Sequence, residues 1–198
     1  MAKGSGMIEP HMATLLSFIA TNVNISPKLL DSILLKEAES SFNSITIDGC
    51  QSTNDMLVII SNNQSGIKIS SKKDKYYNEF VNALSFVMKD LAKKLVMDGE
   101  GATKLIEINI INAKKIKDAK ELAYSIANSN LFKTAMFGKD LNWGRINAAL
   151  GSADCDIDPG SVDIYLSDTL IVKSGTKADF DRKQAEKLMK DEEIKFTV

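Results

Sequence analysis

The spacing of apolar residues along the chain predicts helices in its first hundred residues. After Thr14, residues 15–22 (LLSFIATN) are interpreted as a short helix. Ser26 is predicted to cap a second helix with Pro27 at its first position, where a missing backbone N–H does no harm. The longest helix is expected over residues 74–97, because apolar residues recur there at helical spacing.

Apolar runs and apolar–polar alternation predict the strands. Residues 56–62 (MLVIISN) form an apolar run typical of a buried strand, and residues 105–112 (LIEINIIN) alternate. Two further strands, separated by Ser167 and Asp168, indicate a hairpin. The remaining expected elements are strands at 44–49, 161–166, 169–174 and 193–198, a loop or edge strand at 67–71, and helices at 114–128, 142–151 and 181–192. The predicted fold class is α+β, layered, with a mostly antiparallel sheet.

Composition and charge narrow the class of protein. The 198 residues are 44% hydrophobic and 26% charged, which suits one sizeable core or two small ones. The net charge is −1, so the sequence has no electrostatic footprint for nucleic acid or a membrane surface. No apolar run reaches the roughly 18 residues of a membrane span, and the N-terminus lacks the apolar centre of a signal peptide. A cytoplasmic protein is therefore expected.

Metal and phosphate sites have little support in the sequence. Cys50, Cys155 and the single histidine, His11, do not have the spacing of metal ligands. Neither the P-loop motif nor the dinucleotide-binding GxGxxG motif occurs. We therefore expect no metal and no bound cofactor.

Thr14 follows a glycine-rich approach, and its hydroxyl has two candidate roles. An N-terminal threonine is a good nucleophile, because its own α-amino group, with a pKa of about 7.7–8.0, accepts the hydroxyl proton. This role requires cleavage of the Ala13–Thr14 bond, which the hydroxyl can drive by attacking the Ala13 carbonyl to form an ester that water opens. The small Ala13 and the flexible glycines upstream permit the strained turn. The alternative is that Thr14 is the N-cap of the predicted helix.

Glu100 and His11 are two further candidates for a catalytic or binding role. Glu100 lies between glycines in residues 98–104 (DGEGATK), where its carboxylate could bind an ammonium group or act as acid or base. Its alternative is a solvated turn after a helix that ends at Gly99. His11 is a candidate general base for Thr14, but it would leave with the upstream product of cleavage, so no catalytic role is assigned to it.

Two polar segments leave structural and functional readings open. Residues 48–55 (DGCQSTND) either form a turn through hydrogen bonds to their own backbone, which is favoured, or line a polar pocket. In residues 138–151, Trp143 and Arg145 either provide an anchor for a carboxylate or serve as a core indole and a structural ion-pair partner.

Four motifs, in this order, resemble those of the ornithine acetyltransferases (glutamate N-acetyltransferases) of arginine biosynthesis. They are residues 3–16 (KGSGMIEPHMATLL), 41–55 (SFNSITIDGCQSTND), 98–104 (DGEGATK) and 142–151 (NWGRINAALG). The similarity covers nearly the whole chain from Lys3 onward, and the first block is specific to that family. The resemblance favours Thr14 as a nucleophile and implies the layered α/β sandwich of these enzymes.

The resemblance also implies a reaction and its residues. Members cleave themselves at the position of Ala13–Thr14 into α and β chains that stay together, here expected as an α2β2 heterotetramer. Thr14 would take acetyl from N2-acetylornithine, and glutamate would then attack the acetyl-enzyme. By position in the motifs, Lys3 and Glu100 match substrate-binding residues, a cation and an anion suited to the carboxylate and ammonium of acetylornithine. No cofactor is implied, although some members accept acetyl-CoA as donor.

The same resemblance assigns residues 1–13 to the end of the α chain and residues 14–198 to a single-domain β chain that is truncated at its C-terminus. Family precursors carry a long preceding segment with a Thr-Gly pair that supplies the oxyanion hole, and a tail whose Asn and Thr bind substrate. Activity is therefore expected to need an α-chain partner. The alternatives are an inactive fragment and a related amidohydrolase that uses water as acceptor.

Overall fold

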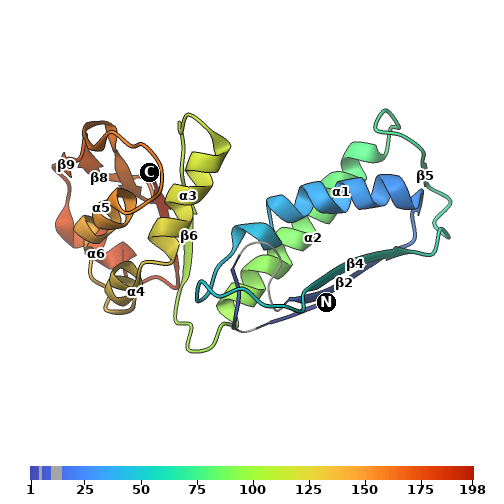
Figure 1. Cartoon of the computed structure of the whole chain (residues 1–198), viewed down its shortest axis with the longest axis horizontal. Coiled ribbons are helices and arrows are strands. Elements are labelled where there is room, and N and C mark those ends of the chain that lie inside the picture. Colours follow the sequence, from blue (N-terminus) through green and yellow to red (C-terminus); the bar gives the residue numbers. More distant parts are fainter. Residues whose placement is uncertain (5, 10–14) are drawn as a thin grey trace. The chain divides into compact units, whose positions relative to one another are not determined.

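The computed structural model describes residues 1–4, 6–9 and 15–198, which form two compact units, Met1–Ala102 and Thr103–Val198 (Figure 1). The residues expected to form a single domain, 14–198, are distributed over both units. Each unit has its own hydrophobic core, so each is described by itself. Among the described residues, no helix is both long enough and apolar enough to cross a membrane.

The first unit packs two helices on one side of a small sheet. Figure 1 shows α1 and α2 on the same side of β2 and β4. Strands β2 and β4 run parallel, with residue pairs from Leu16–Met56 to Thr21–Ser61, and β1 pairs antiparallel with the start of β2. The elements are β1 Ala2–Lys3, β2 Leu16–Thr21, β3 Asn24–Ile25, α1 Pro27–Glu39, a 3₁₀ turn Phe42–Ser44, β4 Met56–Ser61, β5 Lys68–Ile69 and α2 Tyr77–Met97.

Local signals in the sequence explain α1 and α2. Ser26 caps α1 as predicted, because its Oγ accepts a hydrogen bond from the backbone N–H of Leu29 (3.4 Å), and Pro27 occupies the first turn. The expected long helix is α2, whose apolar stripe faces α1 and the sheet. The buried apolar residues of the two helices are Leu30, Ile33, Leu34, Ala38, Leu84, Met88, Ala92 and Leu95.

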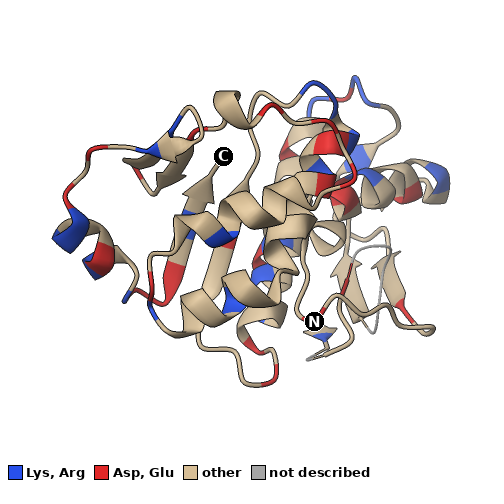
Figure 2. Ribbon diagram, turned by 60° about the vertical axis from the view of Figure 1, so that its left-hand side comes forward, with Lys and Arg blue, Asp and Glu red and all other residues tan. Residues whose placement is uncertain are grey.

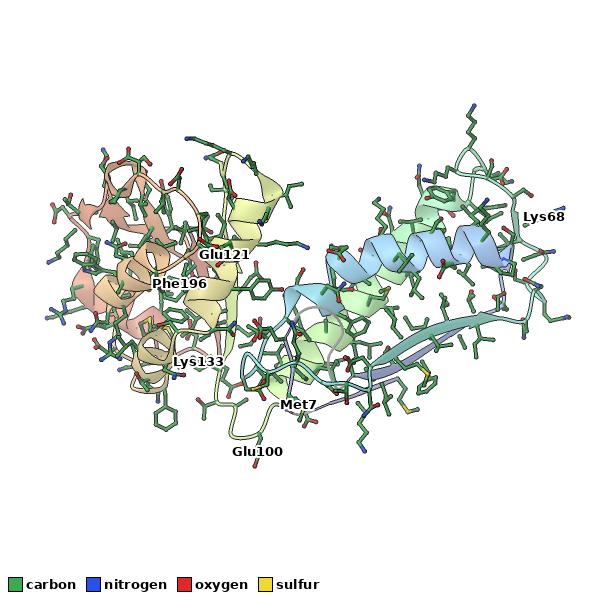
Figure 3. All side chains as sticks on the ribbon, viewed as in Figure 1. Met7, Lys68, Glu100, Glu121, Lys133 and Phe196 are labelled. Carbon is green, nitrogen blue, oxygen red and sulfur yellow. The ribbon has the colours of Figure 1, made fainter. Side chains whose placement is uncertain are left out.

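The second unit contains a five-stranded sheet in the order β6-β10-β7-β8-β9. The hairpin predicted at Ser167 is confirmed between β7 and β8, with Ser167 at a φ of 52°. Phe196, labelled in Figure 3, is fully buried and meets Phe132 edge to face at 5.7 Å between ring centroids. The elements are β6 Leu105–Asn109, α3 Ile116–Ala127, α4 Asn130–Phe137, α5 Trp143–Gly151, a 3₁₀ turn Pro159–Ser161, β7 Ile164–Leu166, β8 Thr169–Lys173, β9 Thr176–Lys177, α6 Arg182–Leu188 and β10 Glu193–Thr197.

Two element predictions in the first unit are wrong. Residues 15–22 were expected to be helical, but Leu16–Thr21 form strand β2 between β1 and β4. A short apolar run does not by itself distinguish a strand from a helix, and here pairing on both sides decides. Residues 44–49 were expected to be a strand, but they form the end of a 3₁₀ turn and an irregular segment, because the side chain of Asp48 engages backbone N–H groups in place of a ladder.

The α+β class is confirmed, and the expectation of a mostly antiparallel sheet is not. The two longest ladders, β2 with β4 and β6 with β10, are parallel, whereas β7, β8 and β9 pair antiparallel. Helix α4 was not predicted at all. Its signals were present in the sequence, because Ser129 caps its start by accepting from the N–H of Phe132, and Gly138 follows its last residue.

Candidate active site

On the upstream side of residues 10–14, the chain is fixed by the carboxylate of Asp48. The backbone N–H of Met7 donates to Oδ2 of Asp48 (2.6 Å), and that of Ile8 donates to Oδ1 (3.1 Å). Oδ1 also accepts from the N–H of Cys50 (3.0 Å), which closes a local turn. The turn predicted for residues 48–55 is therefore confirmed, and it also binds a segment 40 residues earlier in the chain.

The backbone of Ile8 is held from its other side as well. Its carbonyl accepts from the N–H of Ile47 (2.9 Å) and from the hydroxyl of Thr46 (3.2 Å). The Ile8 side chain is buried, with 3% of its surface exposed. Residue 8 is thus fixed through its N–H, its carbonyl and its side chain.

On the downstream side, Leu15 is fixed in the same manner. Its N–H donates to Oδ1 of Asp55 (2.8 Å), and its carbonyl accepts from the N–H of Met56 (2.8 Å), where the ladder between β2 and β4 begins. Leu15 is also buried in the core of the first unit. The predicted cleavage residues Ala13 and Thr14, together with His11, lie outside the described residues, and the structure anchors the chain on both sides of them.

Lys3 is brought to the beginning of β2. It is the residue opposite Leu16 in the antiparallel pairing of β1 with β2, and its side chain is exposed. The pairing is extended by mutual backbone hydrogen bonds between Met1 and Phe18 (3.0 and 2.9 Å). Lys3 also lines an open hollow together with residues near the end of α2, among them Lys94.

Glu100 lies in the loop that follows α2, and its side chain is exposed and directed away from the ribbon (Figure 3). The loop bends back on itself, since the N–H of Ala102 donates to the carbonyl of Gly99 (2.9 Å). A Cβ on Gly99 would lie 3.2 Å from Cδ1 of Ile47, so this glycine permits close packing. Ile47 also donates its N–H to the carbonyl of Ile8. One continuous region of the first unit therefore contains the Glu100 loop, the 48–55 turn and the anchored backbone of Ile8.

The alternative role of Thr14 as a helix N-cap is wrong, because the helix expected after it is absent from the described residues 15–22 and Leu16–Thr21 form strand β2. The alternative site around Trp143 is structural. Trp143 packs partly buried against the core of the second unit. Arg145 donates from Nη1 to the carbonyl of Leu131 (2.6 Å) and to the hydroxyl of Thr134 (2.8 Å), so its guanidinium ties α5 to α4. This differs from both the carboxylate anchor and the ion pair considered from the sequence.

The pKa of Asp48 lies below its ordinary value of 3.8. Burial, the largest single influence, pushes this pKa upwards, but the hydrogen bonds from the N–H groups of Cys50, Met7 and Ile8 together outweigh it. The native structure therefore favours the ionised carboxylate. Elsewhere, Figure 2 shows Lys and Arg interspersed with Asp and Glu along the chain.

This shift predicts an acid-dependent loss of stability in the first unit. Because the pKa of Asp48 is lower in the folded than in the unfolded state, its contribution is present above pH 3.8 and is lost as the pH falls through the lower folded value. We expect Asp48→Asn to unfold at a lower temperature than the parent at pH 7, with the difference shrinking below about pH 4. Thermal unfolding of both chains, measured from pH 7 down to about pH 2, checks the prediction. A difference in unfolding temperature that stays the same below about pH 4 would contradict it.

Comparisons with known proteins identify the family of the chain. A family model described as "ArgJ family" matches residues 1–198. The arginine biosynthesis bifunctional proteins ArgJ of Streptococcus mutans and Symbiobacterium thermophilum are 45% and 42% identical over 198 and 197 residues; the matches cover 100% of this chain but 50% and 49% of those proteins. The chain thus spans about half the length of these curated relatives.

A solved structure extends the agreement to the fold. The crystal structure of the arginine biosynthesis bifunctional protein from Bacillus halodurans superposes with a TM-score of 0.84 and 34% identity, covering 91% of this chain and 85% of that one. The family resemblance drawn from the four motifs is therefore confirmed. With all of its residues matched by the family model, the chain belongs to the ArgJ family.

Proposed function

We propose that this chain is the nucleophile-bearing part of an acetyltransferase of arginine biosynthesis. In the proposed reaction, the chain cleaves itself between Ala13 and Thr14, the freed Thr14 takes acetyl from N2-acetylornithine, and glutamate accepts it. The observation that carries the proposal is the anchoring of the backbone at Ile8 and Leu15, on either side of this bond. Membership of the ArgJ family supports the proposal, and the names of the relatives indicate a role in arginine biosynthesis.

The charged residues expected at the site suit the proposed substrate. Acetylornithine has a carboxylate and an ammonium group, for which Lys3 and Glu100 provide opposite charges. Both side chains are exposed, and both belong to the first unit. Lys3 pairs with Leu16, the first residue of β2. Leu16 is two positions after Thr14 in the chain. We propose that Lys3 binds the carboxylate and Glu100 the ammonium.

A second polypeptide segment is part of the proposal. The relatives are about twice as long as this chain. The outer face of the sheet, opposite α1 and α2, carries adjacent apolar side chains, since Leu16 pairs with Met56 and Phe18 with Val58. Leu16, Phe18 and Met56 are each 40% exposed and Ile60 is 61% exposed. We propose that the remaining part of the enzyme covers this face and supplies the oxyanion donors.

The charge assignment predicts separate effects on substrate binding. Lys3→Ala and Glu100→Gln are each expected to lower kcat/KM for acetylornithine by about tenfold or more, mainly by raising KM, because each removes a charge-assisted hydrogen bond. Lys94→Ala is the matched control. Lys94 lines the same hollow as Lys3, but its ammonium forms an ion pair with Asp90 (2.7 Å). Equal losses in all three variants would contradict the assignment.

The proposed function is tested by intact mass spectrometry followed by an acetyl-transfer assay. The chain is produced alone and together with the part of the Streptococcus mutans relative that precedes the matched segment. Appearance of a species that lacks residues 1–13, and transfer of acetyl that requires glutamate, are the expected results. Acetate release without glutamate would identify an amidohydrolase instead, and an uncut, inactive chain under both conditions would overturn the proposal.

A further inference from the structure

Residues 48–55 hold the chain on both sides of the Ala13–Thr14 bond. The two ends of this segment are Asp48, which binds the N–H groups of Met7 and Ile8, and Asp55, which binds the N–H of Leu15. Both carboxylates act on residues about 40 positions earlier in the sequence, so these contacts are tertiary and are not local turn geometry.

The segment between the two aspartates is stiffened by its own hydrogen bonds. The N–H of Cys50 donates to Asp48 (3.0 Å), and the N–H of Asn54 donates to the hydroxyl of Ser52 (3.2 Å). At its ends, residues 47 and 56 donate their N–H groups to the carbonyls of Ile8 and Leu15. Each flank of the bond is therefore held through both its N–H and its carbonyl, and the carboxylate bonds are the stronger, charge-assisted kind.

We propose that Asp48 and Asp55 are positioning residues that hold the two flanks of the Ala13–Thr14 bond for attack by the Thr14 hydroxyl. The inference rests on the proposed function. In the step they serve, Thr14 Oγ bonds to the Ala13 carbonyl carbon and loses its proton, the C–N bond breaks, and the Thr14 nitrogen takes the proton to become an amine. Water then opens the ester, which restores the hydroxyl and leaves a carboxylate on Ala13.

The two aspartates act on different products of that step. Asp48 holds residues 7 and 8, which belong to the upstream piece that also carries Lys3. Asp55 holds Leu15, the residue directly after the nucleophile, and continues to do so once Thr14 is N-terminal. Loss of Asp48 should therefore slow cleavage and raise KM through Lys3, whereas loss of Asp55 should slow cleavage and lower kcat for acetyl transfer.

The test compares Asp48→Ala and Asp55→Ala with Asp74→Ala as a matched control. Asp74 also accepts from two backbone N–H groups, those of Ser70 and Ser71, but it lies before α2 and not at the proposed site. Cleavage is followed by intact mass with the relative's upstream part present. Both site variants are expected to cleave about 10- to 100-fold more slowly than the parent, because a small misplacement of reacting groups lowers a rate by that order. The control is expected to cleave at the parental rate.

Two further measurements separate positioning from general loss of stability. Asp55→Asn, which keeps an acceptor oxygen at the same place, is expected to recover part of the cleavage rate. Amide hydrogen exchange in the parent and the variants is expected to rise selectively, at Leu15 in Asp55→Ala and at Met7 and Ile8 in Asp48→Ala. Cleavage of both alanine variants at the parental rate, or slowing equal to that of Asp74→Ala, would overturn the inference.

Failure of the proposed function is recognised separately. If the parent remains uncut with the upstream part present, the acetyltransferase proposal is overturned. The anchoring itself is then decided by exchange alone: unchanged protection of Leu15 in Asp55→Ala would overturn it, and a selective rise would support Asp55 as the residue that fixes this backbone.

Discussion

Replacement of Thr14 by alanine is expected to leave the chain uncut and to reduce acetyl transfer to glutamate by at least about 10³-fold. Alanine has no hydroxyl to attack the Ala13 carbonyl and none to carry the acetyl group, so both steps of the proposed reaction fail. The measurement is intact mass spectrometry, in which the parent should show a piece shortened by residues 1–13 and, with acetylornithine, a mass increase of one acetyl group on the same piece.

Two variants make this result specific to the Thr14 hydroxyl. Thr14→Ser keeps a hydroxyl and is expected to cleave, more slowly because the hydroxyl is less constrained without the methyl group. Thr21→Ala removes a threonine from the other end of β2 and should cleave like the parent. Cleavage of Thr14→Ala at the parental rate, or an acetyl group found on another residue, would contradict the assignment of Thr14.

The strand after Thr14 shows where local pattern fails. Residues 15–22 contain too few positions for periodicity to separate a helix from a strand. The outcome depends on partners that the segment alone does not reveal. These are β4, whose residues lie 40 positions after the β2 residues with which they pair, and β1, which precedes β2. The long helix α2 was predicted well, because its apolar stripe is sustained over many turns and needs no distant partner to be recognised.

The candidate site divides in the same way. Residue identities within motifs pointed to Lys3, Thr14 and Glu100, and the local turn at Asp48 followed from the ability of aspartate to bind its own backbone. The second role of Asp48, and the role of Asp55, did not follow, because each depends on a hydrogen bond to a residue distant in sequence. The signal that could have indicated both roles is a pair of aspartates that bracket a polar turn and follow the block with the proposed cleavage site.

Supplying the upstream part of a relative is expected to raise acetyl transfer by this chain about 10²–10³-fold. That range is the typical effect of one oxyanion donor, which the resemblance assigns to the preceding segment of family precursors. Co-expression with the upstream part of the Streptococcus mutans protein, 45% identical over the matched residues, provides the test. Transfer rates of the purified complex and of the chain alone are compared at equal concentration of this chain.

The apolar outer face of the sheet allows the interface to be tested independently of catalysis. Ile60→Lys places a charge on that face and is expected to abolish both association and the gain in rate, while the isolated chain keeps its stability, because Ile60 is 61% exposed there. Leu35→Lys is the matched control, since Leu35 is equally exposed but lies on α1. If both variants associate like the parent, the partner binds elsewhere on this chain. The source of the oxyanion donors is decided separately. If the upstream parts of both the Streptococcus and the Symbiobacterium relatives leave the rate of acetyl transfer unchanged, the donors do not come from that segment.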